Sequence, residues 1–206
     1  MFMRLALIAV LCGAALTASA GTLSFSGTLP DANGVALVSF ELDATATLVL
    51  QSWGYGGSAA APGGANAAGV VIVGGGLDSY LSLFAGSGAA ATFIASNDDG
   101  PCPPATAAPQ CYDARLLRAS LPAGNSTLAL TQPGNLSFAE NLGSGTLGDG
   151  FIGLEADFHG RTAEWAVDIE SAALVPEPGT VAQWSLGLPG LATVFGRRFL
   201  AQGDSR

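Results

Sequence analysis

The chain has 206 residues and a formal net charge of −9, and only 11% of its residues are charged. All seven basic residues are arginine, which excludes chemistry that needs a lysine, such as a Schiff base or a P-loop. A basic nucleic-acid-binding protein is also excluded, because nothing could neutralise a run of phosphates. Hydrophobic residues make up 49% of the chain, which favours a folded domain over charge-driven disorder.

Residues 1–20 have the three parts of a secretory signal peptide. Arg4 supplies the positive charge, an apolar run follows from Leu5 to Leu16, and Ala18-Ser19-Ala20 provides an A-x-A cleavage site. We therefore expect an N-terminal signal helix that is removed on export. The remaining chain would then begin with a domain over residues 21–174.

The pattern of residues 21–174 is that of an all-β domain. Apolar residues alternate with polar ones at period two, as in Trp165, Val167 and Ile169 against Glu164 and Asp168. Leu117, Ala119 and Leu121 are expected to share a buried face in the same way. Strands are predicted over 22–26, 35–42, 45–53, 80–84, 92–96, 117–121, 127–131 and 165–169. Turn residues separate them, which predicts a single β-sandwich or jelly roll.

Two loops are long. Residues 54–69 are nearly all Gly, Ala, Ser and Pro, without a charge. The span 131–162 has a partly apolar middle in which we expect one or two short strands. No helical periodicity is evident outside the two terminal segments, so the domain should contain almost no helix.

Oxygen-bearing side chains gather around one predicted turn, with others at neighbouring strand ends. Ca²⁺ takes six to eight oxygen ligands in proteins, and a turn with adjacent strand ends can supply them. The alternative is that these side chains hydrogen-bond turn amides. The candidate metal ligands are Asp78, Asn97, Asp98, Asp99 and Asp113.

Cys102 and Cys111 are the cysteines left after signal removal, and both lie in one Pro-rich loop. An even pair in an exported protein predicts a disulfide. Zinc is a poor alternative because His159 is the only histidine and two thiols leave the site short of ligands.

Three further side chains invite a functional reading. His159 is interpreted as a surface residue, since no Gly-x-Ser-x-Gly elbow or α/β pattern accompanies it. Trp53 and Tyr55 fall beside the Gly-rich loop, where aromatic rings can stack on carbohydrate or pack against the loop. Both alternatives stay open for these two rings.

The C-terminal end carries a second signal over residues 175–198. Pro176, Glu177 and Pro178 precede a mostly apolar run, and Arg197 and Arg198 follow it. This order resembles the PEP-CTERM sorting signal of Gram-negative bacteria. The resemblance implies recognition by an exosortase, with the apolar run as a short hydrophobic helix in the inner membrane. By the positive-inside preference, the Arg pair and residues 199–206 would lie in the cytoplasm. The alternative is a Pro-rich linker with an amphipathic end.

The domain itself resembles the bacterial pre-peptidase C-terminal-like β-sandwich that recurs in exported PEP-CTERM proteins. The resemblance covers about residues 22–170 and implies a jelly-roll-like sandwich. It rests on the sequence blocks at residues 75–84, 95–100, 112–116, 121–124 and 165–169.

These features together predict an exported, non-catalytic cell-surface or extracellular-matrix protein. The family context implies an anchor at the membrane before processing, then a place at the cell surface or outside the cell. It further implies a role in biofilm beside exopolysaccharide. The alternative is a binding module for Ca²⁺ or carbohydrate. No coherent catalytic constellation is present in the sequence, and no further cofactor or nucleic-acid partner is expected.

Overall fold

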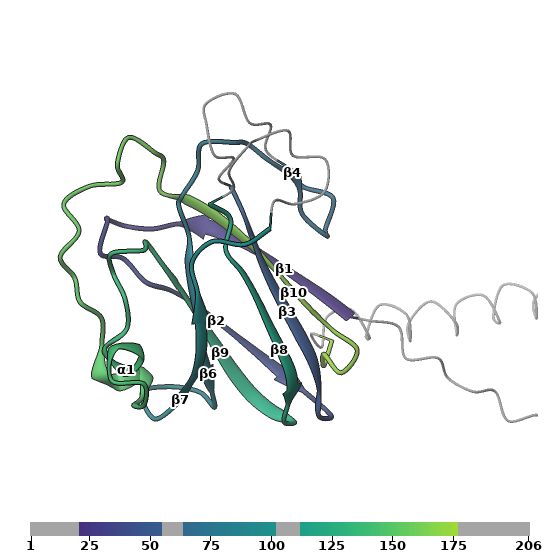
Figure 1. The fold of residues 1–206 in the computed structure, drawn as a ribbon. Helices are drawn as coiled ribbons and strands as arrows, with labels where there is room; N and C mark the ends of the chain where they lie inside the picture. The colour runs from purple at the N-terminus through teal and green to yellow at the C-terminus, as the bar shows by residue number, and fades with distance from the viewer. Residues whose placement is uncertain (1–20, 55–63, 102–111, 177–206) are drawn as a thin grey trace, which may run out of the picture.

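The computed structural model describes residues 21–54, 64–101 and 112–176, and nearly all of its regular structure is strand (Figure 1). The predicted all-β class is therefore confirmed. The signal peptide, the Cys102–Cys111 disulfide and the sorting signal beyond Pro176 lie outside the described residues, as does the expected C-terminal helix. Within the described ranges, no helix is both long and apolar enough to cross a membrane.

Eight strands form two antiparallel four-stranded sheets. Sheet A has the order β1-β10-β3-β8, and sheet B has the order β2-β9-β6-β7. The strands of sheet A are β1 (Gly21–Thr28), β10 (Glu164–Ser171), β3 (Ala46–Trp53) and β8 (Arg115–Leu121). Those of sheet B are β2 (Ala36–Leu42), β9 (Gly124–Thr131), β6 (Tyr80–Ala85) and β7 (Thr92–Asn97).

One hydrophobic core receives side chains from both sheets. Leu48 and Leu50 of β3 and Val167 and Ile169 of β10 are fully buried, as the period-two pattern predicts. Sheet B contributes its own leucines to the same cluster. The fully buried leucines of sheet B, with one from the segment just before β6, are Leu42, Leu77, Leu81, Leu83, Leu128 and Leu130.

The outer face of sheet B is also covered. Phe84 and Ala129 point away from the main core, yet both are buried in a second small cluster. A short helix, α1 (Phe138–Asn141), and a 3-10 turn over Leu147–Asp149 lie over this face, and α1 contacts β7 (Figure 1). The prediction of one or two short strands within 131–162 is therefore wrong. This segment forms a short helix, a 3-10 turn and isolated bridges such as that of Ser137 with Phe151.

The Gly-rich region after β3 contributes a small two-stranded hairpin. Its strands are β4 (Gly64–Ala65) and β5 (Val71–Ile72). The hairpin lies against the outer side of sheet A, where Gly64 meets the ring of Trp53. A Cβ at Gly64 would come within 2.7 Å of that ring, so only a glycine permits this approach.

The predicted face of β8 is wrong. Leu116 and Leu121 are buried, whereas Leu117 is 65% exposed. The pairing register with β3 shifts here, because three residues of β3 (Ala46–Leu48) oppose four of β8 (Arg118–Leu121). Ser120 has φ 56° at this bulge. The extra residue reverses the parity of the strand, which a strict alternation cannot anticipate.

Candidate acidic cation site

Three of the five predicted metal ligands come together. One carboxylate oxygen each from Asp78, Asp98 and Asp99 lies within 4.8 Å of the others. The pairing of β6 with β7 explains this, because Leu81 opposes Asn97 at one end of sheet B. Asp78 precedes β6 and the other two follow β7, so antiparallel pairing brings all three to the same end. We call Asp78, Asp98 and Asp99 the acidic cluster.

Burial and mutual repulsion disfavour full ionisation of this cluster. Burial, together with the charges of Asp98 and Asp99, raises the pKa of Asp78 to about 6 against the opposing effect of Arg161. The pKa of Asp98 is likewise raised, first by burial and then by the charges of Asp99 and Glu140. Ionisation of Asp78 and Asp98 therefore lowers the stability of the folded state.

One positively charged side chain, that of Arg161, contacts the cluster. Arg161 Nη1 lies 3.2 Å from Asp78 Oδ2, and the guanidinium carbon lies 5.1 Å from the centre of the Tyr112 ring. This ion pair and cation–π contact fix the Arg161 side chain beside the cluster. A single arginine offsets only part of the charge of three carboxylates.

Two oxygens of the cluster lack hydrogen-bond partners among the described residues. They are Asp78 Oδ1 and Asp98 Oδ1, and both atoms are buried. Buried carboxylate oxygens ordinarily accept hydrogen bonds or coordinate a metal. Carboxylate oxygens are the ligands that Ca²⁺ and Mg²⁺ prefer, so the donor set fits a hard divalent cation.

The other two predicted ligands make different contacts. Asn97 Nδ2 donates to the carbonyl oxygens of Asp99 and Arg115, at 2.9 and 2.6 Å, which is the turn-stabilising role left open by the sequence. Asp113 is 5% exposed, and its Oδ1 lies 3.4 Å from Ser52 Oγ. Asp113 is therefore part of the link between its own loop and β3.

Glu140 of α1 was not predicted from the sequence. Its carboxylate accepts a hydrogen bond from Ser96 Oγ at 2.6 Å and a short one from the Tyr80 hydroxyl. Burial and the bond to Glu140 raise the pKa of Tyr80 to about 12, so the hydroxyl remains a donor. The signal was present in the sequence, since Ser137 and Glu140 have the spacing of a helix N-terminus and Ser137 Oγ accepts from Glu140 N.

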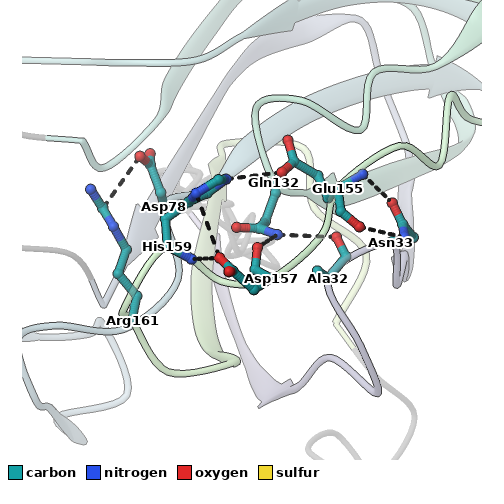
Figure 2. Close-up of polar contacts among 8 residues, drawn as sticks. All are labelled: Ala32, Asn33, Asp78, Gln132, Glu155, Asp157, His159 and Arg161. Carbon is teal, nitrogen blue, oxygen red and sulfur yellow. Dashed lines mark hydrogen bonds and ion pairs between the residues drawn. The ribbon is translucent and has the colours of Figure 1, made fainter.

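Beside the acidic cluster lies a polar network of loops, shown in Figure 2. Asn33 and Glu155 exchange two hydrogen bonds: Asn33 Nδ2 donates to Glu155 O at 2.9 Å, and Glu155 N donates to Asn33 Oδ1 at 2.8 Å. Gln132 is 1% exposed and its Nε2 donates to the carbonyls of Ala32 and Asp157. These bonds join three loops that are distant in sequence.

His159 belongs to the exposed rim of this network. Its Nε2 lies 2.9 Å from Glu155 Oε2, its Nδ1 lies 3.6 Å from Asp157 Oδ1, and its side chain is 65% exposed. Within the described part of the chain, no hydroxyl group hydrogen-bonds the imidazole. Its neighbours are carboxylates, not a nucleophile.

Trp53 is held by a buried carboxylate on the neighbouring strand. Asp168 is 2% exposed, and its Oδ2 accepts hydrogen bonds from Trp53 Nε1 and Ala67 N, both at 2.7 Å. Its Oδ1 accepts from Ser24 Oγ at 2.6 Å. The indole therefore attaches the β4–β5 hairpin to sheet A, which is the packing alternative for this ring. Tyr55 lies outside the described residues.

The predicted sorting motif begins where the described chain ends. Leu174 bridges to Leu42, and Val175 N donates to Glu41 O at 3.0 Å. Pro176 is exposed. Glu177, Pro178, Arg197 and Arg198 lie outside the described residues, as do Cys102 and Cys111.

No family model matches this chain, and a search of curated proteins finds no significant match. The resemblance to exported sorting-signal proteins therefore rests on the quoted motifs, and what it implies for function is a proposal.

Proposed function

We propose that this is an exported, non-catalytic cell-surface or extracellular-matrix protein, sorted by an exosortase through its C-terminal signal. A jelly-roll-like β-sandwich would be the part displayed at the surface. The observation that carries the proposal concerns the last described residues: Val175 N still donates to Glu41 O, and Pro176 is exposed. A membrane enzyme acting on Pro176-Glu177-Pro178 would thus meet its motif just beyond the domain.

The arrangement of the polar residues supports a non-catalytic role. His159 contacts two carboxylates at an exposed rim, and Asp168 is saturated by structural donors. General base catalysis needs a base within hydrogen-bond reach of a nucleophile or substrate proton. His159 instead contacts residues of its own loop, and Asp168 connects the β4–β5 hairpin to sheet A.

The test separates sorting from folding. The cut is placed after Pro176, because Val175 still donates to Glu41 in the folded domain. We expect the truncated protein to keep its melting temperature and to leave the membrane and surface fractions of an exosortase-bearing host. The Arg197→Glu/Arg198→Glu variant is an independent second test: it keeps the full length and should lose retention without a change in melting temperature. If truncated and full-length proteins fractionate identically, the sorting proposal is wrong.

A second candidate function is that of a weak divalent-cation module, with Ca²⁺ held by the acidic cluster. The unpartnered, buried oxygens of Asp78 and Asp98 favour it, together with the 4.8 Å convergence of three carboxylates. Three side chains supply fewer ligands than Ca²⁺ takes, so water or backbone oxygens would complete the shell. Binding at the surface of an exported protein would therefore be of the weak, extracellular class, in the range of about 0.1–1 mM.

Thermal unfolding with Ca²⁺ or EDTA tests this candidate. A cation that binds only the folded protein raises the melting temperature by mass action. The rise should vanish in Asp98→Asn and persist in Asp43→Asn, which removes the same charge from an exposed turn away from the cluster. Equal melting curves of the unmodified protein with millimolar Ca²⁺ and with EDTA would leave only the turn-stabilising interpretation.

A further inference from the structure

Strand β1 is a sheet edge that no other described strand covers. All eight residues of β1 pair with β10 in an unbroken register from Gly21–Ser171 to Thr28–Glu164. On its other side, no strand in the described ranges pairs with it. The strand contains no charged residue, no proline and no bulge. Natural sheets use these three devices to prevent edges from pairing with another chain.

The other three edges are protected. Strand β8 carries Arg115 and Arg118 and contains the bulge described above. Strand β7 is covered near its start, where Phe93 N donates to Gly145 O. Strand β2 carries Glu41, whose carbonyl accepts from Val175. Among the strands that the structure describes, β1 alone presents a long, neutral edge.

Apolar surface lines the same edge. An open hollow of about 420 Å³ extends along residues 21–25, and Ala67, Ala68 and Leu174 line it as well. A second hollow, of about 400 Å³, extends along residues 26–28 and is lined by the segment 71–73 of the hairpin. Val71 and Val73 in that segment are 76% and 74% exposed. A strand added to β1 would therefore find both backbone partners and an apolar wall.

We propose that β1 pairs with β1 of a second copy of this chain in an antiparallel two-fold dimer. Such pairing would join two copies of sheet A into one eight-stranded sheet. The two-fold axis must pass through a residue position, Ser24 or Phe25, and not between two residues. Directly opposed residues of an antiparallel pair point to the same face, so only this register keeps Leu23 and Phe25 of both copies on the core face. Identical edges related by a two-fold axis are self-complementary, which is the commonest way that homodimers form.

Charge favours a second copy at this edge and disfavours association elsewhere. The chain carries a net charge of −9, so most faces repel one another, while β1 is neutral. Three acidic residues lie one strand inward: Asp168, opposite Ser24, is buried and hydrogen-bonded, whereas the exposed Glu164 and Glu170 lie opposite Thr28 and Thr22. In the Phe25-centred register they would be three strand spacings apart, about 14 Å, which exceeds the screening length of about 8 Å at physiological salt.

Sedimentation of the exported full chain in mild detergent tests the proposal, since detergent keeps the apolar segment from driving association. The Thr22→Lys/Ser26→Lys variant places four lysines on one face of the shared strand pair. We expect its dimer dissociation constant to rise at least about tenfold over the wild type. Both lysines also lower the net negative charge, so a general loss of repulsion would instead strengthen association. The control Ser39→Lys, on the exposed face of β2, should dimerise as the wild type does.

Two outcomes would overturn the proposal: a monomeric wild type throughout the concentration range, or a dimer that survives both lysines. Hydrogen exchange of the unmodified protein gives an independent readout, because amides of β1 should gain protection with rising concentration while those of β8 do not. Uniform protection of both strands at all concentrations would also refute β1 pairing. Fractionation of the tag variants is unaffected by any of these results, so this inference and the proposed sorting function fail separately.

Discussion

Replacing Asp168 by alanine is expected to destabilise the protein more than any other single change on the outer face of sheet A. The carboxylate is 2% exposed and accepts three hydrogen bonds, from Ser24, Trp53 and Ala67. A hydrogen bond to a charged group contributes about 1.5–3 kcal/mol, but alanine also removes the cost of burying the charge. Alanine would leave three donors without their acceptor, at about 1–3 kcal/mol for each one that stays buried, so after the removed cost of burying the charge the net loss should be about 3–5 kcal/mol.

Thermal unfolding measures this loss directly. For a domain of this size, each kcal/mol lowers the melting temperature by about 2–4 °C, so we expect a decrease of roughly 6–20 °C. Glu170→Ala is the matched control, because Glu170 lies two residues away on the same strand and is exposed. Its effect should stay within about 0.5 kcal/mol.

Hydrogen exchange at Ala67 gives the result that would refute the reasoning. In the wild type this amide donates to Asp168 and should exchange slowly. In Asp168→Ala it should exchange at the rate of an open loop, together with the rest of the β4–β5 hairpin. If Asp168→Ala melts like Glu170→Ala and the Ala67 amide stays protected, the hairpin is held by other contacts.

Four more predictions rest on burial and charge. Without Ca²⁺, Asp98→Asn should stabilise the protein by about 1–3 kcal/mol in chemical denaturation, because it removes repulsion between carboxylates within 4.8 Å; a loss of stability would contradict the repulsion. Since the pKa of Asp78 is raised from 3.8 to about 6, its stabilising contribution is complete below pH 3.8 and is lost as the pH rises through 6, which melting at several pH values without Ca²⁺ should show. Ca²⁺ affinity should fall about tenfold from about pH 7 to pH 5 by calorimetry, and a flat profile would exclude Asp78 as a ligand. Leu116→Ala should cost about 2–5 kcal/mol and Leu117→Ala less than about 0.5, and equal losses would refute the bulge in β8.

The candidate site could be predicted only in part from the sequence. Asp78, Asp98 and Asp99 were predicted together because strand ends and turns are easily recognised, and antiparallel pairing of neighbouring strands then brings them close. Asp113 was grouped with them because it lies beside the next predicted strand, yet its carboxylate contacts Ser52 of β3. Glu140 was missed because the span around it was expected to form strands, although its capping spacing was visible.

The sequence by itself determined the class of the fold, since alternation at period two and the turn residues between strands are local properties of the chain. Only the tertiary structure decided which side chains on the outer faces of the two sheets are buried. The alternation placed Asp168 on an exposed face with Glu164 and Glu170, but the hairpin containing Ala67 covers it from a hundred residues earlier in the chain. The bulge at Ser120 likewise reversed the face of β8. Alternation reports which side of a strand a residue occupies, whereas long-range contacts decide whether that side meets water or another part of the protein.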